Sequence, residues 1–238
     1  MHITVIPTVE QIRPKLITGK TVIVIDVLRA SSTIVTALHS GFASVTPVAT
    51  IEKAYALRSP SIVLAGERHC EKIAGFDYTN SPTALAQGQH EGKHLVLTTT
   101  NGTRAMQQLE QAGRILVGCF LNATACITEA LAQQRDIVLC CAGTRGEFAL
   151  EDGLAAGLMV HVAKQHVPMV SACDASEVLE AGYLQLADKL AERLCTSITG
   201  RRLTARQHTE DVLFCSQRDV MQTVPVDQEK RILLPASS

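Results

Sequence analysis

Short apolar runs of strand length alternate along this chain with segments whose apolar residues recur at helical spacing. The runs at 22–25 (VIVI) and 137–141 (IVLCC) are apolar at every position, as is typical of strands buried on both faces. Alternation at this spacing favours a mostly parallel sheet. The sequence therefore predicts an α/β protein with helices on both faces of its sheet.

The same patterns set the expected elements. Strands are predicted at 2–6, 21–26, 44–49, 61–65, 94–99, 114–118, 136–141 and 167–171. Helices are predicted at 31–40, 51–58, 82–88, 103–112, 123–134, 152–166, 175–195 and near 208–216, before an extended tail. Asp174 and Glu177 have the spacing of a capping box for the helix at 175–195. Because no linker rich in Pro, Gly or Ser divides the chain, we expect one compact unit over 1–238, with possible halves at about 1–110 and 111–238.

Composition narrows the class of protein. The chain has 238 residues, 46% of them hydrophobic and 19% charged, which indicates a globular domain. The net charge is -1 and no basic tract occurs, so nucleic acid is not an expected partner. Most of the eight cysteines lie in apolar patterns and no secretory signal is present, which favours reduced thiols and a cytoplasmic location. No apolar run reaches the roughly 18 residues of a membrane span.

Four segments share the form strand, polar loop, helix, and each carries an arginine in or beside its loop. These arginines are Arg29, Arg68, Arg104 and Arg145. In an open α/β sheet, such loops converge at the carboxyl ends of the strands, where ligands bind. Converging guanidinium, hydroxyl and backbone N–H groups predict a receptor for a small molecule with several negative charges.

The first segment, VIDVLRASSTIVTAL, delivers Asp26 at a strand end, followed by Arg29 and by a helix start with Ser31, Ser32 and Thr33. A strand-end carboxylate can hold a divalent metal or act as a nucleophile. Hydroxyl and N–H groups at the helix start suit an anionic oxygen. The alternative is structural, with Asp26 capping a turn and pairing with Arg29 while the serines cap the helix.

Two further segments have polar loops after a strand. In GERHCEKIAGFDYTNSP, Glu67 and Arg68 lie at the strand exit, and Asn80, Ser81 and Pro82 have the pattern of a helix start. This stretch could equally be a surface loop, and its His69 is a weak acid–base candidate. In TTTNGTRAM, a tight turn predicts substrate contacts from the polar positions Thr100, Asn101, Gly102 and Thr103. Its alternative is an ordinary capped helix.

The fourth segment, CCAGTRGEFALEDG, predicts substrate contacts from Gly143, Thr144 and Arg145. Three acidic residues follow, and together with Asp26 they could form a metal site: Glu147, Glu151 and Asp152. The alternative is that these acids are favourable charges in the first turn of a helix.

Several known catalytic patterns are absent. Cys140 and Cys141 are separated from Arg145 by four and three residues, whereas a cysteine phosphatase needs Cys-x5-Arg. The chain has no Gly-x4-Gly-Lys-Ser/Thr and no Gly-x-Gly-x-x-Gly pattern. It lacks the second aspartate of the haloacid-dehalogenase pattern, and no Cys/His spacing indicates zinc. Cys140 and Cys141 are therefore expected to pack within a strand.

The chain resembles the 2-phosphosulfolactate phosphatase family. The resemblance rests on DVLRASSTIVTAL, GERHCEKIAGFDYTNSP, TTTNGTRA, AGTRGEFALEDG and VLFCSQRDVMQTVP, in the family order. It implies an α/β fold and an Mg²⁺-dependent phosphatase that forms sulfolactate, a step of coenzyme M synthesis. The family's motifs map onto Asp26 and Arg29, Glu67 and Arg68, Asn80 and Ser81, 100–103 and 143–152.

The residues and the resemblance agree on the kind of substrate. Phosphosulfolactate carries phosphate, sulfonate and carboxylate groups, which several arginines would bind. Asp26 and one of Glu67, Glu147, Glu151 or Asp152 would supply the carboxylates that Mg²⁺ prefers. Either a metal-bound water attacks phosphorus, or Asp26 attacks it and forms an acyl phosphate. The other hypotheses are a lyase or transferase acting on the same anion and a non-hydrolytic anion-binding module. The tail could contribute to a homodimer.

Overall fold

The computed structural model describes residues 1–68, 70–99, 108–228 and 231–234. Within them lies an 11-stranded sheet with the order β5-β4-β6-β3-β11-β10-β7-β2-β8-β1-β9. Its strands are β1 (His2–Ile6), β2 (Thr21–Ile25), β3 (Ser44–Pro47), β4 (Ile62–Arg68), β5 (Glu71–Lys72), β6 (His94–Thr98), β7 (Arg114–Gly118), β8 (Ile137–Cys141), β9 (Ser171–Ala172), β10 (Val226–Gln228) and β11 (Arg231–Leu233).

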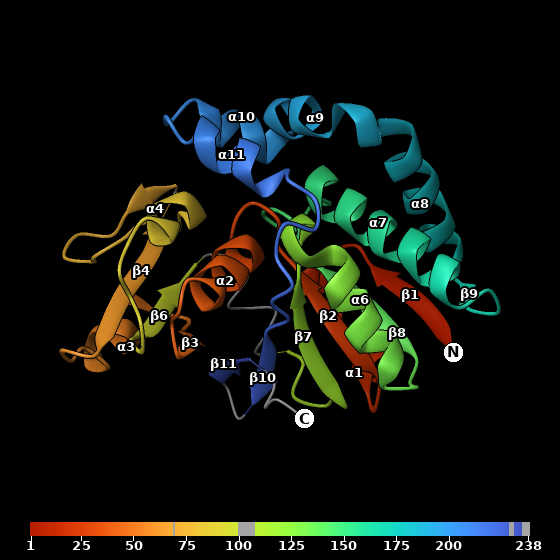
Figure 1. Ribbon diagram of the computed structural model, residues 1–238, viewed down its shortest axis with the longest axis horizontal. Coiled ribbons are helices and arrows are strands. Elements are labelled where there is room, and N and C mark those ends of the chain that lie inside the picture. The colour runs from red at the N-terminus through yellow and green to blue at the C-terminus, as the bar shows by residue number, and fades with distance from the viewer. Residues whose placement is uncertain (69, 100–107, 229–230, 235–238) are drawn as a thin grey trace.

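The sheet consists of two parallel parts joined by an antiparallel hairpin (Figure 1). In one part, β2 pairs in parallel with β7 and β8, and β1 pairs in parallel with β8 and β9. In the other part, β6 pairs in parallel with β3 and β4. The hairpin of β10 and β11 connects them, with Val226 opposite Leu116 and Ile232 opposite Val45. The predicted α/β class with a mostly parallel sheet is confirmed. The partners of β2, which are β7 and β8, come after residue 110 in the sequence.

The helices pack on the sheet and across its end (Figure 1). They are α1 (Pro14–Ile17), α2 (Ala30–His39), α3 (Ile51–Ala56), α4 (Pro82–Ala86), α6 (Ala123–Ala132), α7 (Leu150–His166), α8 (Asp174–Leu186), α9 (Leu190–Thr196), α10 (Ile198–Thr204) and α11 (Thr209–Cys215). Every residue of α2 except His39 is buried, and every residue of β2 and β8 is buried. Figure 1 shows α8 to α11 as an arch above one end of the sheet. None of the described helices is long and apolar enough to cross a membrane.

Several expected elements differ from the structure. The strand predicted at 167–171 is reduced to Ser171–Ala172, because Pro168 has no N–H for a sheet and Met169 is 91% exposed. The helix predicted at 175–195 is divided into α8, a 3-10 turn (Ala187–Lys189) and α9. Its N-cap is Cys173 without a side-chain cap, so the capping box is wrong. Residues 108–112, the described part of the helix predicted at 103–112, form turns and a bridge.

Candidate active site

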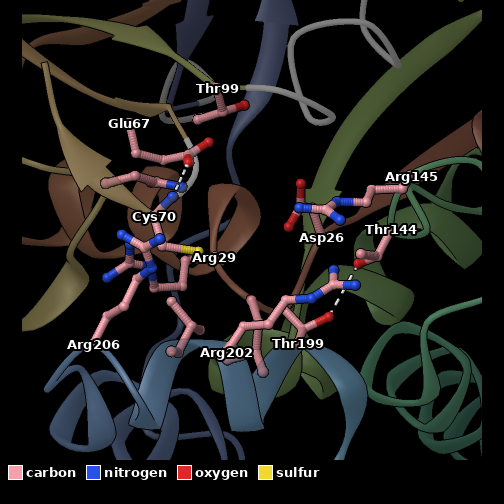
Figure 2. Close-up of a pocket in the computed structure, with 13 residues that line it drawn as sticks. Asp26, Arg29, Glu67, Cys70, Thr99, Thr144, Arg145, Thr199, Arg202 and Arg206 are labelled. Atoms are coloured by element: carbon pink, nitrogen blue, oxygen red, sulfur yellow. Dashed lines mark hydrogen bonds between the residues drawn. The ribbon is translucent and has the colours of Figure 1, made fainter.

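A cavity of about 340 Å³ lies where the loops that follow the parallel strands face α10 (Figure 2). Loops after β2, β4, β6 and β8 contribute to it, as expected for the carboxyl ends of strands in an α/β sheet. Among the described residues, the charged groups in its wall are two carboxylates and four guanidinium groups, an excess of positive charge that suits an anionic ligand. The residues that line it are Asp26, Leu28, Arg29, Glu67, Cys70, Asn80, Thr99, Thr144, Arg145, Thr199, Arg202, Leu203 and Arg206.

The start of α2 holds Asp26 in this wall. The Asp26 N–H donates to Ser31 Oγ at 2.9 Å, and Ser31 Oγ donates in turn to the Val24 carbonyl at 3.2 Å. Asp26 Oδ1 accepts the Ala30 N–H at 3.2 Å. Ser32 Oγ donates to the Val27 carbonyl at 2.8 Å. The hydroxyls of Ser31 and Ser32 thus stabilise the loop through hydrogen bonds to its backbone.

Thr33, the third hydroxyl residue predicted to bind substrate, is fully buried, and its Oγ1 has no hydrogen-bond partner among the described residues. None of these three helix-start residues lines the cavity. What this segment presents to a ligand is therefore the Asp26 carboxylate and Arg29. The peptide bond before Arg29 is cis.

Arg29 is held by a carboxylate far away in the sequence. Its Nη1 donates to Asp211 Oδ2 at 2.5 Å, and both side chains are 2% exposed. The other oxygen of Asp211 accepts from Ser81 Oγ at 2.8 Å and from Thr83 Oγ1 at 2.6 Å. Asp211 on α11 therefore fixes Arg29 and the start of α4 together. Since Arg29 still lines the cavity, its position is set before any ligand binds.

Burial raises the pKa of Asp26 to about 7. The N–H of Ala30 lowers it, nearby Glu151 and Glu67 raise it further, and Arg29 lowers it. A carboxyl group that exchanges its proton near neutral pH is common at catalytic centres, because it can serve as a base there. This makes Asp26 the leading candidate for the reacting group.

The loop after β4 forms the opposite wall. Glu67 lines the cavity, and its Oε2 accepts the Cys70 N–H at 2.7 Å. Asn80 also lines it and is 4% exposed, and no described residue hydrogen-bonds its Oδ1. Ser81 caps α4 as predicted and donates to Asp211, but it does not line the cavity.

Arg68 lies apart from this cavity. Its guanidinium donates to the Glu67 carbonyl at 2.7 Å and to Thr98 Oγ1 at 3.0 Å. It lines a separate shallow hollow near Tyr55. Arg68 therefore does not join Arg29 and Arg145 in the receptor that the sequence predicted.

The loop after β8 is a tight turn. Thr144 and Glu147 exchange backbone hydrogen bonds of 2.8 and 3.1 Å, and Arg145 and Gly146 between them have φ of 56° and 82°. Positive φ at both central positions is typical of a type I′ turn. Thr144 Oγ1 hydrogen-bonds Thr199 Oγ1 at 3.0 Å, which joins this turn to α10 (Figure 2). Gly143, at φ 69°, supports the turn without lining the cavity.

A second hollow of about 490 Å³ adjoins the cavity. It shares four residues with the cavity and adds Glu147, Phe148, Ala149, Leu150, Glu151 and Ile198; the shared residues are Thr144, Arg145, Thr199 and Arg202. Ile198 is 51% exposed and Phe148 44%, so the outer rim of this hollow is apolar. The turn after β8 and the start of α10 form the boundary between the two hollows.

The predicted metal ligands occupy three different places. Asp152 is 2% exposed and accepts the N–H groups of Val27 (2.8 Å) and Gly143 (3.0 Å), so it joins two strand-end loops beneath the site. Glu147 is exposed in the second hollow. Glu151 is 1% exposed, and its Oε1 has no hydrogen-bond partner in the part of the chain that the structure describes.

Among the described residues, no three His, Cys, Asp or Glu side chains form a group that could hold a metal ion. Mg²⁺ nevertheless often uses only one or two carboxylates and takes its other ligands from water and phosphate. Asp26 and Glu151 could supply these two carboxylates. Both are buried, repulsion from Glu151 raises the pKa of Asp26, and Glu151 Oε1 has no hydrogen-bond partner among the described residues. Buried carboxylates of this kind are stabilised by a cation.

Four cavity residues come from the part of the chain that the sequence analysis left without a role. Thr199, Arg202, Leu203 and Arg206 follow an i, i+3, i+4, i+7 spacing, which places them on one face of α10 and the turn after it. This spacing is the sequence signal from which these residues could have been predicted to share a face. Of the three strand-end arginines that the structure describes, Arg29 and Arg145 line the cavity and Arg68 does not. The predicted residues at 69 and 100–104 lie outside the described residues.

The eight cysteines are all free. Burial raises the pKa of Cys140 to about 12 and that of Cys141 well above its usual value. Both thiols are fully buried in β8. They therefore stay protonated and pack within the strand, as their spacing to Arg145 predicted.

The fold and the site define an α/β protein with an arginine-rich anion site at its strand ends. The family model described as 2-phosphosulpholactate phosphatase matches residues 6–230. The chain therefore belongs to the 2-phosphosulpholactate phosphatase family, whose named activity is that of a phosphoric monoester hydrolase.

Curated relatives carry the same name. A protein of Thermotoga petrophila named probable 2-phosphosulfolactate phosphatase is 40% identical over 87% of this chain and 88% of its own length. Proteins with that name from Caldanaerobacter subterraneus subsp. tengcongensis and Clostridium acetobutylicum are 35% and 33% identical. Both matches cover 94% of this chain, and they cover 95% and 97% of the relatives.

Proposed function

We propose that this protein hydrolyses a small polyanionic phosphomonoester, 2-phosphosulfolactate, to sulfolactate and phosphate with the help of Mg²⁺. The observation that carries the proposal is that Asp26 and Arg29 line the same cavity at the strand ends. The family membership and the names of the relatives support the substrate.

Phosphoryl transfer depends chiefly on positioning and on stabilising charge. Arg29, fixed by Asp211, binds the phosphoryl oxygens without first having to be ordered. A guanidinium presents paired N–H donors to phosphate, and its charge is permanent. Asp26 then either attacks phosphorus or accepts the proton of the attacking water.

Asp26 and Glu151 are the residues that would hold Mg²⁺. When bound, the ion supplies positive charge against the phosphate oxygens and the leaving group. Its presence would also remove the repulsion between these two buried carboxylates. Glu67, which faces Asp26 from the opposite wall, is the further carboxylate near the reacting group.

The test is release of inorganic phosphate from 2-phosphosulfolactate and from a panel of small phosphorylated acids, with Mg²⁺ or with EDTA. We expect release that EDTA abolishes and that Asp26→Asn reduces at least 100-fold. A ligand-induced thermal shift without phosphate release would favour an anion-binding module. Loss of substrate without phosphate release would indicate a lyase or transferase.

Metal binding has a test that does not depend on turnover. We expect Mg²⁺ to raise the melting temperature of the wild type, and to do so far less for Asp26→Asn and Glu151→Gln. Glu147→Gln is the matched control, because Glu147 is an exposed acid four residues before Glu151, in the loop that precedes α7. Equal shifts in all four proteins would contradict the metal assignment.

A further inference from the structure

The four arginines of the cavity differ in how strongly protein carboxylates already engage them. Arg29 and Arg206 each form an ion pair, with Asp211 and Glu71 respectively. Arg145 and Arg202 form no ion pair with any residue that the structure describes. Their guanidinium groups are therefore available to a ligand without breaking an internal contact.

These two arginines also share a position. Both line the cavity and the second hollow, so they stand where the two meet. Their stems leave segments that are tied together by the hydrogen bond between Thr144 and Thr199. Figure 2 shows Arg202 reaching from α10 towards the side of the cavity where Arg145 enters. Two guanidinium groups held in this way present several N–H donors to one anionic group.

We propose that Arg145 and Arg202 bind the sulfonate of the substrate while its phosphate lies at Asp26 and Arg29; this rests on the function proposed above. A sulfonate has three acceptor oxygens and one diffuse charge, which suits two converging guanidinium groups. Its weak hydration also suits a site beside an apolar rim. Arg202 is thus a residue that determines specificity, and Asp26 and Arg29 act on the phosphoryl group.

The first test measures binding of the product, sulfolactate, by calorimetry. Arg202→Gln should bind sulfolactate about 10- to 100-fold more weakly than the wild type, the range of one or two charged hydrogen bonds. Its affinity for inorganic phosphate should change less than threefold. Arg201→Gln is the control, because Arg201 lies on the same helix, outside the cavity, and donates to the Thr196 carbonyl.

The second test compares kcat/KM for 2-phosphosulfolactate with kcat/KM for 2-phospholactate, which lacks the sulfonate. Arg202→Gln and Arg145→Gln should each lose about 10- to 100-fold on the first substrate and less than threefold on the second. Equal losses on both substrates, or none, would overturn the proposal. Melting temperatures within 2 °C of the wild type would show that the variants are folded.

The two tests separate this proposal from the function on which it rests. If the wild type released no phosphate from any phosphorylated acid, the proposed function would fail. The sulfolactate affinities would still decide the role of Arg202. A wild type that did not bind sulfolactate, or an Arg202→Gln variant with unchanged affinity, would overturn the sulfonate site itself.

Discussion

Replacing Asp26 by Asn should remove activity and stabilise the protein. Asp26 is 8% exposed, and burial holds its pKa at about 7 against 3.8 for the free side chain. The amide keeps an oxygen for the Ala30 N–H but carries no charge. It can neither attack phosphorus nor accept a proton, so turnover should fall at least 100-fold.

The size of the stabilisation follows from proton linkage. The folded protein keeps the Asp26 proton up to about pH 7, whereas the unfolded chain loses it near pH 4. Stability therefore falls as pH rises between these values and changes no further above them. A difference of about three pKa units, at 1.36 kcal/mol each, corresponds to about 4 kcal/mol. For a chain of this size that is a shift in melting temperature of roughly 10 °C.

The assay is thermal or urea unfolding of both proteins in EDTA between pH 4 and pH 8. The advantage of Asp26→Asn over the wild type should be small at pH 4 and should grow to its full value by pH 8. Asp188→Asn, which changes an exposed aspartate, should show no such growth. A stability difference that did not vary with pH, or near wild-type kcat with Mg²⁺, would refute the reasoning.

Three further perturbations test other parts of the structure. Arg29→Lys should lower kcat/KM by about 1.5–3 kcal/mol, chiefly through kcat. Lysine cannot both bind phosphate and keep the geometry of the ion pair with Asp211. Unchanged steady-state kinetics would mean that Arg29 has a structural role. Cys140→Ser should retain kcat, while unfolding shows a loss of about 1–3 kcal/mol from a hydroxyl in an apolar strand. Trapping of a phosphocysteine at this position in the wild type would contradict this. His90 is 5% exposed, its ring nitrogens have no hydrogen-bond partner within the described ranges, and burial lowers its pKa. Wild-type stability should therefore fall as pH drops below about 6.5. His90→Phe should flatten that fall in melting curves between pH 8 and pH 5, and parallel curves would count against it.

The sequence by itself determined the strands and the edge of the sheet at which the site lies. Strands such as β2 and β8 are apolar at every position because helices cover both of their faces. Parallel strands end at one edge, so Asp26, Glu67 and Thr144 could be expected to meet there. Local chemistry also predicted the Ser81 cap of α4.

Only the tertiary structure decided which side chains enter the cavity. Glu67 and Arg68 are neighbours at the end of β4, and successive residues of a strand point to opposite faces, so one lines the cavity and the other a separate hollow. Arg202 lies on a short helix. The spacing of the residues there predicts that they share one face of the helix, but not what that face contacts. The position of that face is set by contacts between residues distant in sequence. These are the pairing of Arg29 with Asp211, 182 residues apart, and the packing of α10 and α11 across the strand ends. Such contacts depend on how the whole chain packs, and no local sequence pattern predicts them.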